Sequence, residues 1–153
     1  MALTVQFLMN RPAPYDDYIM DHIRNARNYR TLPDADRDTV GFNPLCGDRI
    51  TLQLRMTGGR IAEAAYQCEC CGVSMASSSM MTEWVKGRAP GEALQFARHL
   101  VGSVSGRATA SAEPGEIERA LLATARDFPS RARCAVLPWT TLESLLEEIE
   151  AGK

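Results

Sequence analysis

A β-hairpin is the element that most constrains how this chain can fold. Apolar and polar side chains alternate through residues 50–56, which is the pattern of a strand with one buried face. Gly58-Gly59 follows and predicts a tight turn. After that turn, residues 61–70 are expected to return as the antiparallel partner strand, with Cys68 and Cys70 on the same face.

Helical periodicity predicts most of the remaining elements. Apolar residues recur at spacings of three and four in five segments, near residues 14–25, 72–86, 90–101, 116–126 and 142–149. Gly87 is expected to end the second of these helices as a left-handed cap. Pro138 is expected to limit where the last helix starts, because proline fits only the first turn of a helix.

Length and charge exclude several classes of protein. The chain has 153 residues and is expected to be a single domain over 1–153, with an N-terminal extension at 1–13. Residues 102–115 are rich in Gly, Ser and Ala and are predicted to form a flexible loop. The 17 basic and 19 acidic residues give a net charge of -2, so there is no electrostatic reason to expect nucleic acid or a membrane as a partner.

The first residues and the cysteine count indicate the compartment. The apolar residues 2–9 are interrupted by Thr4 and Gln6 and have no basic residue before them, unlike a signal peptide or a spanning helix. A cytoplasmic location is therefore expected. The odd count of five cysteines favours reduced thiols that act as ligands or nucleophiles.

Three cysteines and one aspartate lie where predicted elements end. They are Cys46 and Asp48 in one short segment, Cys71 before the second helix, and Cys134 in the C-terminal third of the chain. Thiolate and carboxylate ligands at such positions can converge on one tetrahedral metal or iron-sulfur centre. Each residue alone is more often structural, so only their combination predicts a site.

Local charge is expected to favour the thiolate at two of these positions. Cys71 and Cys134 are predicted to begin helices, where free backbone N–H groups stabilise an anion. Arg131 and Arg133 would add to this effect beside Cys134.

Other reactive side chains are assigned structural roles. Strand alternation places Cys68 and Cys70 with the core, and they are interpreted as small core residues. They remain candidates for auxiliary ligands, or for a disulfide with a neighbour if the strand ends early. His22 is expected to be packed or hydrogen-bonded, and residues 77–79, a run of serines, are expected to lie along a helix without a hydrolase motif.

Four segments resemble the U-type iron-sulfur cluster assembly family, which includes IscU, SufU and the N-terminal domain of NifU. They are residues 18–22 with 25–28, then 43–48, 71–81 and 128–134. The SufU branch is the most similar, because the interval between the second and third cysteines is long and Arg133 stands where other branches have histidine. The Leu-Pro-Pro-Val-Lys chaperone-binding motif of the IscU branch is absent, so no dedicated Hsp70-type partner is implied.

The resemblance implies a fold and a ligand set. The fold would be α+β, a small antiparallel sheet of about three strands packed against several helices. The metal ligands would be Cys46, Asp48, Cys71 and Cys134, holding Zn2+, and Arg131 could hold a docked anionic group. Cys68 and Cys70 replace glycines that are typical of SufU, which leaves open whether they also serve the site.

The resemblance also implies an activity and partners. Cys46 would accept persulfide sulfur from a cysteine desulfurase of the SufS type, making the protein at most a zinc-dependent sulfurtransferase. Sulfur would pass on to iron-sulfur recipient proteins or other assembly factors. Two alternatives stay open: a scaffold that builds a transient 2Fe-2S cluster, or holds iron, on the same four side chains, and a zinc-stabilised module without sulfur transfer.

Overall fold

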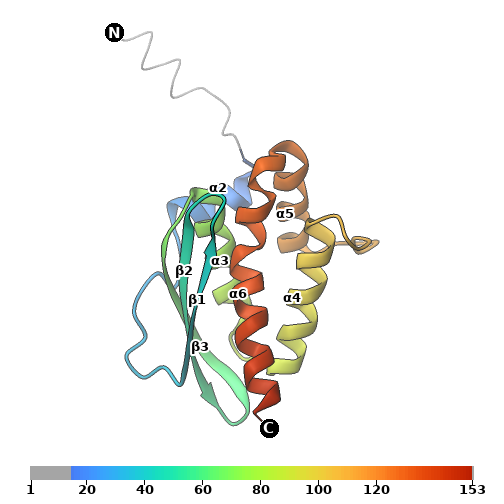
Figure 1. The fold of residues 1–153 in the computed structure, drawn as a ribbon. Helices are drawn as coiled ribbons and strands as arrows, with labels where there is room; N and C mark the ends of the chain where they lie inside the picture. Colours follow the sequence, from blue (N-terminus) through green and yellow to red (C-terminus); the bar gives the residue numbers. More distant parts are fainter. Residues whose placement is uncertain (1–14, 153) are drawn as a thin grey trace, which may run out of the picture.

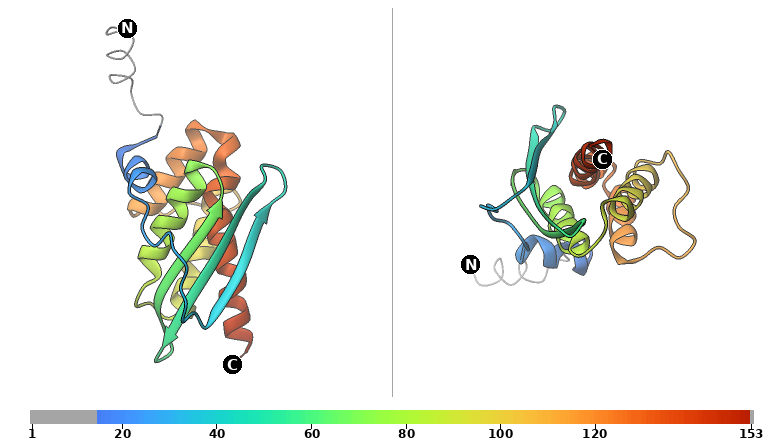
Figure 2. Two further views of the ribbon diagram at one scale, coloured as in Figure 1. Left: turned by 90° about the vertical axis from the view of Figure 1, so that its left-hand side faces the viewer. Right: turned by 90° about the horizontal axis from the view of Figure 1, so that it is seen from below.

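The computed structural model describes residues 15–152, which form a three-stranded antiparallel sheet and a layer of helices. The strands are β1 (Arg37–Asn43), β2 (Asp48–Thr57) and β3 (Arg60–Glu69), in the order β1-β2-β3. Figure 2 shows α3 and α6 against one face of the sheet, with α4 and α5 behind them. The expected α+β fold with about three strands is confirmed, while the predicted extension at 1–13 lies outside the described residues.

The predicted hairpin is present. β2 and β3 pair as antiparallel neighbours, with Leu52 opposite Tyr66. Gly58 and Gly59 both have positive φ, 60° and 77°, which a residue with a Cβ atom rarely adopts. Ile50, Leu52 and Leu54 of β2 are buried, as their alternation with polar residues predicted.

The third strand, β1, has no clear signature in the sequence. Arg37–Asn43 lies at the sheet edge, where Val40 and Phe42 are exposed and charged residues begin the strand. β1 nevertheless lies directly against α6: a Cβ atom added at Gly41 would come within 1.8 Å of the Thr141 hydroxyl oxygen. Glycine at position 41 therefore lets the strand and the helix approach closely.

The predicted helices are all present, with some shifted ends (Figure 1). Their bounds are α2 (Asp17–Arg24), α3 (Gly72–Val85), α4 (Pro90–Val104), α5 (Glu116–Asp127) and α6 (Ala132–Ala151), with a short 3-10 helix, η1 (Pro129–Arg131), before α6. Gly87 has φ 82° just after α3, as predicted. No helix among residues 15–152 has the length and apolar character needed to cross a membrane.

The segment between α4 and α5 is shorter than the predicted loop, because α4 continues through Val104. Its middle is tied to both helices by Ser111. The Ser111 backbone N–H donates to Glu118 Oε2 at 3.2 Å, and its hydroxyl lies 2.9 Å from His99 Nε2. His99 Nε2 is in turn 2.8 Å from Glu118 Oε2. The predicted flexibility of this segment stays a prediction.

The expectation about Pro138 is wrong, because α6 begins at Ala132 and carries Pro138 in its interior. A proline has no N–H, so the carbonyl of Cys134 one turn earlier loses its usual helical donor. The hydroxyl of Ser74 in α3 lies 3.0 Å from that carbonyl oxygen and shares its one hydrogen between it and the carboxylate of Asp48, and Ser77 donates to the next carbonyl, of Ala135, at 2.6 Å. Side chains of a neighbouring helix thus replace the missing backbone donor.

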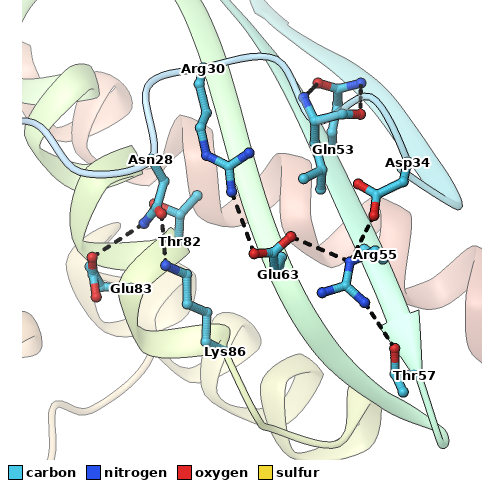
Figure 3. A network of polar contacts seen from close by, with 11 residues as sticks. Asn28, Arg30, Asp34, Gln53, Arg55, Thr57, Glu63, Thr82, Glu83 and Lys86 are labelled. Atoms are coloured by element: carbon cyan, nitrogen blue, oxygen red, sulfur yellow. Dashed lines mark hydrogen bonds and ion pairs between the residues drawn. The ribbon is translucent and has the colours of Figure 1, made fainter.

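A strap of chain, residues 25–36, joins α2 to β1 and crosses β3 on its way (Figure 3). Asn28, with φ 63°, accepts from Lys86 Nζ at 2.7 Å through its side-chain oxygen, and its carbonyl accepts from the Tyr66 N–H at 3.0 Å. Gln53 of β2 accepts from the Leu32 N–H at 2.8 Å. These bonds fix α2 and β1 relative to the hairpin.

Candidate metal centre

The turn between β1 and β2 presents Cys46 at the surface. Asn43 shapes the turn: its side-chain oxygen accepts from the Leu45 N–H at 3.1 Å, and its carbonyl accepts from the Gly47 N–H at 2.8 Å. Gly47 has φ 76°, which favours glycine there. The Cys46 thiol is free and exposed, and Leu45 beside it is 71% exposed.

Asp48, the first residue of β2, is only 6% exposed. Its Oδ2 accepts from the Ser74 hydroxyl at 2.7 Å. Burial by itself would raise the pKa of Asp48, but hydrogen bonds from Ser74 and from the thiols of Cys134, Cys71 and Cys46 lower the pKa below its ordinary value. The carboxylate is therefore held ionised inside a ring of sulfur and oxygen donors.

Cys71 is the N-cap residue of α3 and is half-buried. This is the position before a helix that the sequence predicted. Its sulfur lies 3.8 Å from the Ser74 hydroxyl oxygen, so Ser74 contacts Cys71 as well as Asp48. Gly72 follows, where an added Cβ atom would lie 3.3 Å from the Ile23 side chain, and α2 therefore packs closely on the start of α3.

Cys134 is the third residue of α6 and only 1% exposed. The expectation of a favoured thiolate there is wrong in this structure. Burial, together with the neighbouring Cys71 and Asp48, raises the pKa of Cys134 above its ordinary value, because a further negative charge would be desolvated next to other acidic groups.

Three of the four predicted ligands lie in one tight group. One ligand atom each from Cys46, Asp48 and Cys134 lies within 4.8 Å of the other two. Cys71 is outside that tight group, although its thiol hydrogen-bonds toward Asp48 and Cys134. The Sγ atoms of Cys46 and Cys134 are 3.9 Å apart.

The donor set fits a zinc ion. Zinc–sulfur bonds of about 2.3 Å in a tetrahedron put two sulfur ligands roughly 3.8 Å apart, close to the spacing of Cys46 and Cys134. Thiolates and a carboxylate also suit an iron-sulfur cluster. A cation here would offset the charge repulsion that opposes ionisation of Cys134.

Arg131, in η1, lies beside this group. Its electrostatic interaction with the Cys71 side chain, followed by a hydrogen bond to Cys134, raises the pKa of the Arg131 guanidinium above its ordinary value. Arg131 therefore adds a positive charge at the mouth of the site.

Cys68 and Cys70 are not the free core thiols that strand alternation suggested. β3 ends at Glu69, and the two cysteines are joined by a disulfide and only half-buried. The alternative of a disulfide with a neighbour, if the strand ends early, is the one the structure shows. An early end of the strand frees Cys70 from the ladder, which lets its side chain turn back toward Cys68.

The expectations for His22 and for the run of serines are confirmed, and one residue was missed. His22 is buried and its Nδ1 lies 2.7 Å from the Ser79 hydroxyl, so it is a packed, hydrogen-bonded histidine. Serines 77–79 lie along α3. No role was predicted for Ser74, whose hydroxyl contacts Asp48, Cys71 and the Cys134 carbonyl. Its position three residues after Cys71, on the same side of a helix start, was the available signal.

Comparison with known proteins decides the family. The family model described as "NifU-like N terminal domain" matches residues 14–135. The chain belongs to this family. Zinc-dependent sulfurtransferase SufU of Bacillus subtilis (strain 168) is 36% identical over 149 residues, covering 97% of this chain and 99% of that protein. The iron-sulfur cluster assembly scaffold protein IscU of Streptococcus pyogenes serotype M1 is 34% identical over 134 residues, covering 87% and 82%.

Solved structures agree with this assignment. A putative iron-sulfur cluster assembly scaffold protein for the SUF system from Fervidobacterium islandicum AW-1 has a TM-score of 0.73 at 27% identity, covering 87% of this chain and 96% of that one. The predicted U-type family and its SufU-like branch are confirmed. This NifU-like chain is a SufU-like iron-sulfur cluster assembly protein whose clustered thiols and carboxylate can bind a metal.

Proposed function

We propose that the protein accepts persulfide sulfur at Cys46 from a cysteine desulfurase of the SufS type. Zinc would be held by Cys46, Asp48, Cys71 and Cys134. The observation that carries the proposal is the contrast within one ligand group: the Cys46 thiol is exposed on a short turn, whereas Asp48 and Cys134 are buried. The similar Bacillus protein is named a zinc-dependent sulfurtransferase, which supports the same chemistry.

Each residue has a distinct part in this proposal. Bound zinc would lower the pKa of coordinated thiols and keep them ordered. Cys46 is the ligand best able to leave, since its turn is held by two local hydrogen bonds to Asn43. Asp48, an oxygen ligand in a sulfur-rich set, binds a soft metal less firmly than a thiolate and lets the site open.

Arg131 would receive the anionic group that a desulfurase brings to the site. Its guanidinium lies at the thiols of Cys71 and Cys134, close to where a persulfide sulfur would arrive. The sulfur would then pass to iron-sulfur recipient proteins or other assembly factors.

A Cys46→Ala variant tests the acceptor role. With the host's cysteine desulfurase and cysteine as substrate, wild-type protein is expected to stimulate turnover and to gain one sulfur atom on Cys46. The variant should do neither, while the control double variant Cys68→Ser/Cys70→Ser, which keeps Cys46, still gains the sulfur atom. If Cys46→Ala stimulates desulfurase turnover as the wild type does, Cys46 is not the sulfur acceptor.

Metal analysis separates the other candidates. The donor set also suits a transient 2Fe-2S cluster, and the similar Streptococcus protein is named a scaffold. Protein purified without oxygen should contain stoichiometric zinc and no visible absorbance, whereas iron with acid-labile sulfide would favour the scaffold. A purely structural zinc module predicts that the desulfurase neither binds nor responds.

A further inference from the structure

The Cys68–Cys70 disulfide lies at the end of the β2–β3 ladder where β2 begins with Asp48, although neither cysteine belongs to the ligand group. Cys68 is opposite Ile50 in the β2–β3 ladder, two residues from Asp48 and on the same face of β2. Cys70 directly precedes Cys71 in the chain. The sheet end that carries Asp48 thus also carries this disulfide.

Packing ties the disulfide to the same two helices as the site. Cys68 packs against a small cluster of Ile50, Tyr66 and Leu137, which Met75 also joins. Leu137 lies one turn after Cys134 in α6, and Met75 follows Ser74 in α3. The Cys68 sulfur is therefore next to the helical turns that hold Cys134 and Ser74.

The pair is accessible from solvent. Both residues are half-buried rather than fully enclosed in the core. A redox partner can reach such a disulfide without unfolding the protein. Among residues 15–152, the other cysteines are Cys46 and Cys134 in the ligand group and Cys71 at its edge. Cys68 and Cys70 are therefore the two cysteines that can cycle between dithiol and disulfide without giving up a ligand.

We infer that Cys68 and Cys70, as a reduced dithiol, convert the persulfide on Cys46 to sulfide and become the disulfide seen in the structure. This inference rests on the proposed sulfur acceptance at Cys46. The sulfane sulfur needs two electrons to leave as sulfide, and a dithiol that closes to a disulfide supplies two.

The proposed steps balance. The Cys70 thiol attacks the Cys46 sulfur that carries the sulfane atom, a Cys46–Cys70 disulfide forms, and hydrogen sulfide leaves with the thiol proton. The Cys68 thiol then attacks Cys70 in this mixed disulfide, which forms Cys68–Cys70 and returns Cys46 as a thiol. A dithiol reductant protein of the thioredoxin class, reaching the half-buried pair from solvent, would restore the pair for the next cycle.

The test measures sulfide from one turnover of the full-length protein. Protein is reduced, freed of reductant without oxygen, and loaded either by the desulfurase with cysteine or directly by inorganic polysulfide. Wild-type protein is expected to release about one sulfide per chain with no added reductant, and peptide mapping should show the Cys68–Cys70 disulfide forming in step. The Cys68→Ser/Cys70→Ser double variant should keep the persulfide on Cys46 and release sulfide about tenfold more slowly or worse.

Two matched controls sharpen the result. Cys68→Ser alone should accumulate the Cys46–Cys70 mixed disulfide, because the second thiol is missing. Wild-type protein loaded while Cys68–Cys70 is still oxidised should behave as the double variant does, and this control needs no substitution.

Failure of the inference is distinguishable from failure of the proposed function. Equal sulfide release from the double variant, or a persulfide that persists in reduced wild-type protein, would overturn the role of the pair while leaving acceptance at Cys46 intact. If the desulfurase loads no variant but polysulfide does, the acceptor proposal fails and the polysulfide arm still decides the inference. If neither source loads Cys46, both fail.

Discussion

The metal centre has a buried, rigid half, formed by Asp48 and Cys134, and an exposed half, formed by Cys46. Asp48 and Cys134 are buried between the sheet and two helices, and the Ser74 hydroxyl shares its one hydrogen between the Asp48 carboxylate and the Cys134 carbonyl. Cys46 sits on a surface turn with exposed neighbours. A site of this kind can hold a metal with its buried ligands, the rigid half, and perform its chemistry with the exposed one.

Removal of the metal is expected to lower stability more than any substitution below, because a bound ion would connect the buried and the exposed half. A ligand present at 100 to 1,000 times its dissociation constant stabilises a protein by about 2.7–4.1 kcal/mol, and chelation of zinc should cost about that much. Denaturant unfolding with and without a chelator measures this loss in the free energy of unfolding. Hydrogen exchange should rise most at residues 43–47, and an equal rise in the first turn of α3 would contradict the division into two halves.

Ser74→Ala should damage the rigid half. It leaves the Cys134 carbonyl without a donor, because Pro138 has no N–H to offer, and removes the hydroxyl from Asp48. An unsatisfied buried group costs about 1–3 kcal/mol, measurable as a loss in the free energy of unfolding.

Ser78→Ala is the matched control for this substitution. Ser78 is equally buried in α3, but its hydroxyl bonds only to the Ser74 carbonyl of its own helix, so its loss should cost less. In a Ser74→Ala/Pro138→Ala pair, the restored N–H should recover part of the loss, with a coupling of about 0.5–3 kcal/mol. If the two changes in the free energy of unfolding are strictly additive, Ser74 does not compensate for the N–H that Pro138 lacks.

Acid should weaken the packing of α2 on α3, away from the metal. Burial, followed by the positive charge of Arg27, lowers the pKa of His22, while Asp21 and Glu83 oppose that shift. The unfolded chain therefore binds a proton first, and stability falls as pH drops below the ordinary histidine value near 6.5, by at most about 1.4 kcal/mol per pH unit. A His22→Gln variant should show a flatter stability curve between pH 7 and 5, and an unchanged slope would count against this assignment.

Cys46→Ser should have the smallest effect on stability. In metal-free protein, an exposed turn residue is expected to change the free energy of unfolding by less than about 0.5 kcal/mol. The same variant should lose sulfur acceptance. A large destabilisation of the metal-free form would show that the turn belongs to the rigid half.

Local periodicity made much of the fold predictable. The hairpin around Gly58-Gly59 and the helices that begin at Gly72 and Pro90 follow patterns set by neighbouring residues. Local periodicity did not predict β1, because it is a polar edge strand whose position depends on contact with α6 through Gly41. The prediction from Pro138 was wrong for a related reason. The hydroxyl groups that replace its N–H come from α3, and Ser74 lies 60 residues before Cys134, whose carbonyl it contacts.

The candidate site shows the same division. The order and context of the cysteines by themselves determined the family and named Cys46, Asp48, Cys71 and Cys134, because ligand chemistry is written in residue type and spacing. The exposure of the Cys46 thiol, the contact of Ser74 with the ligands and the bond between Cys68 and Cys70 became visible only in the folded chain. Burial and long-range hydrogen bonds depend on elements that meet only after folding, and local sequence carries no record of those distances.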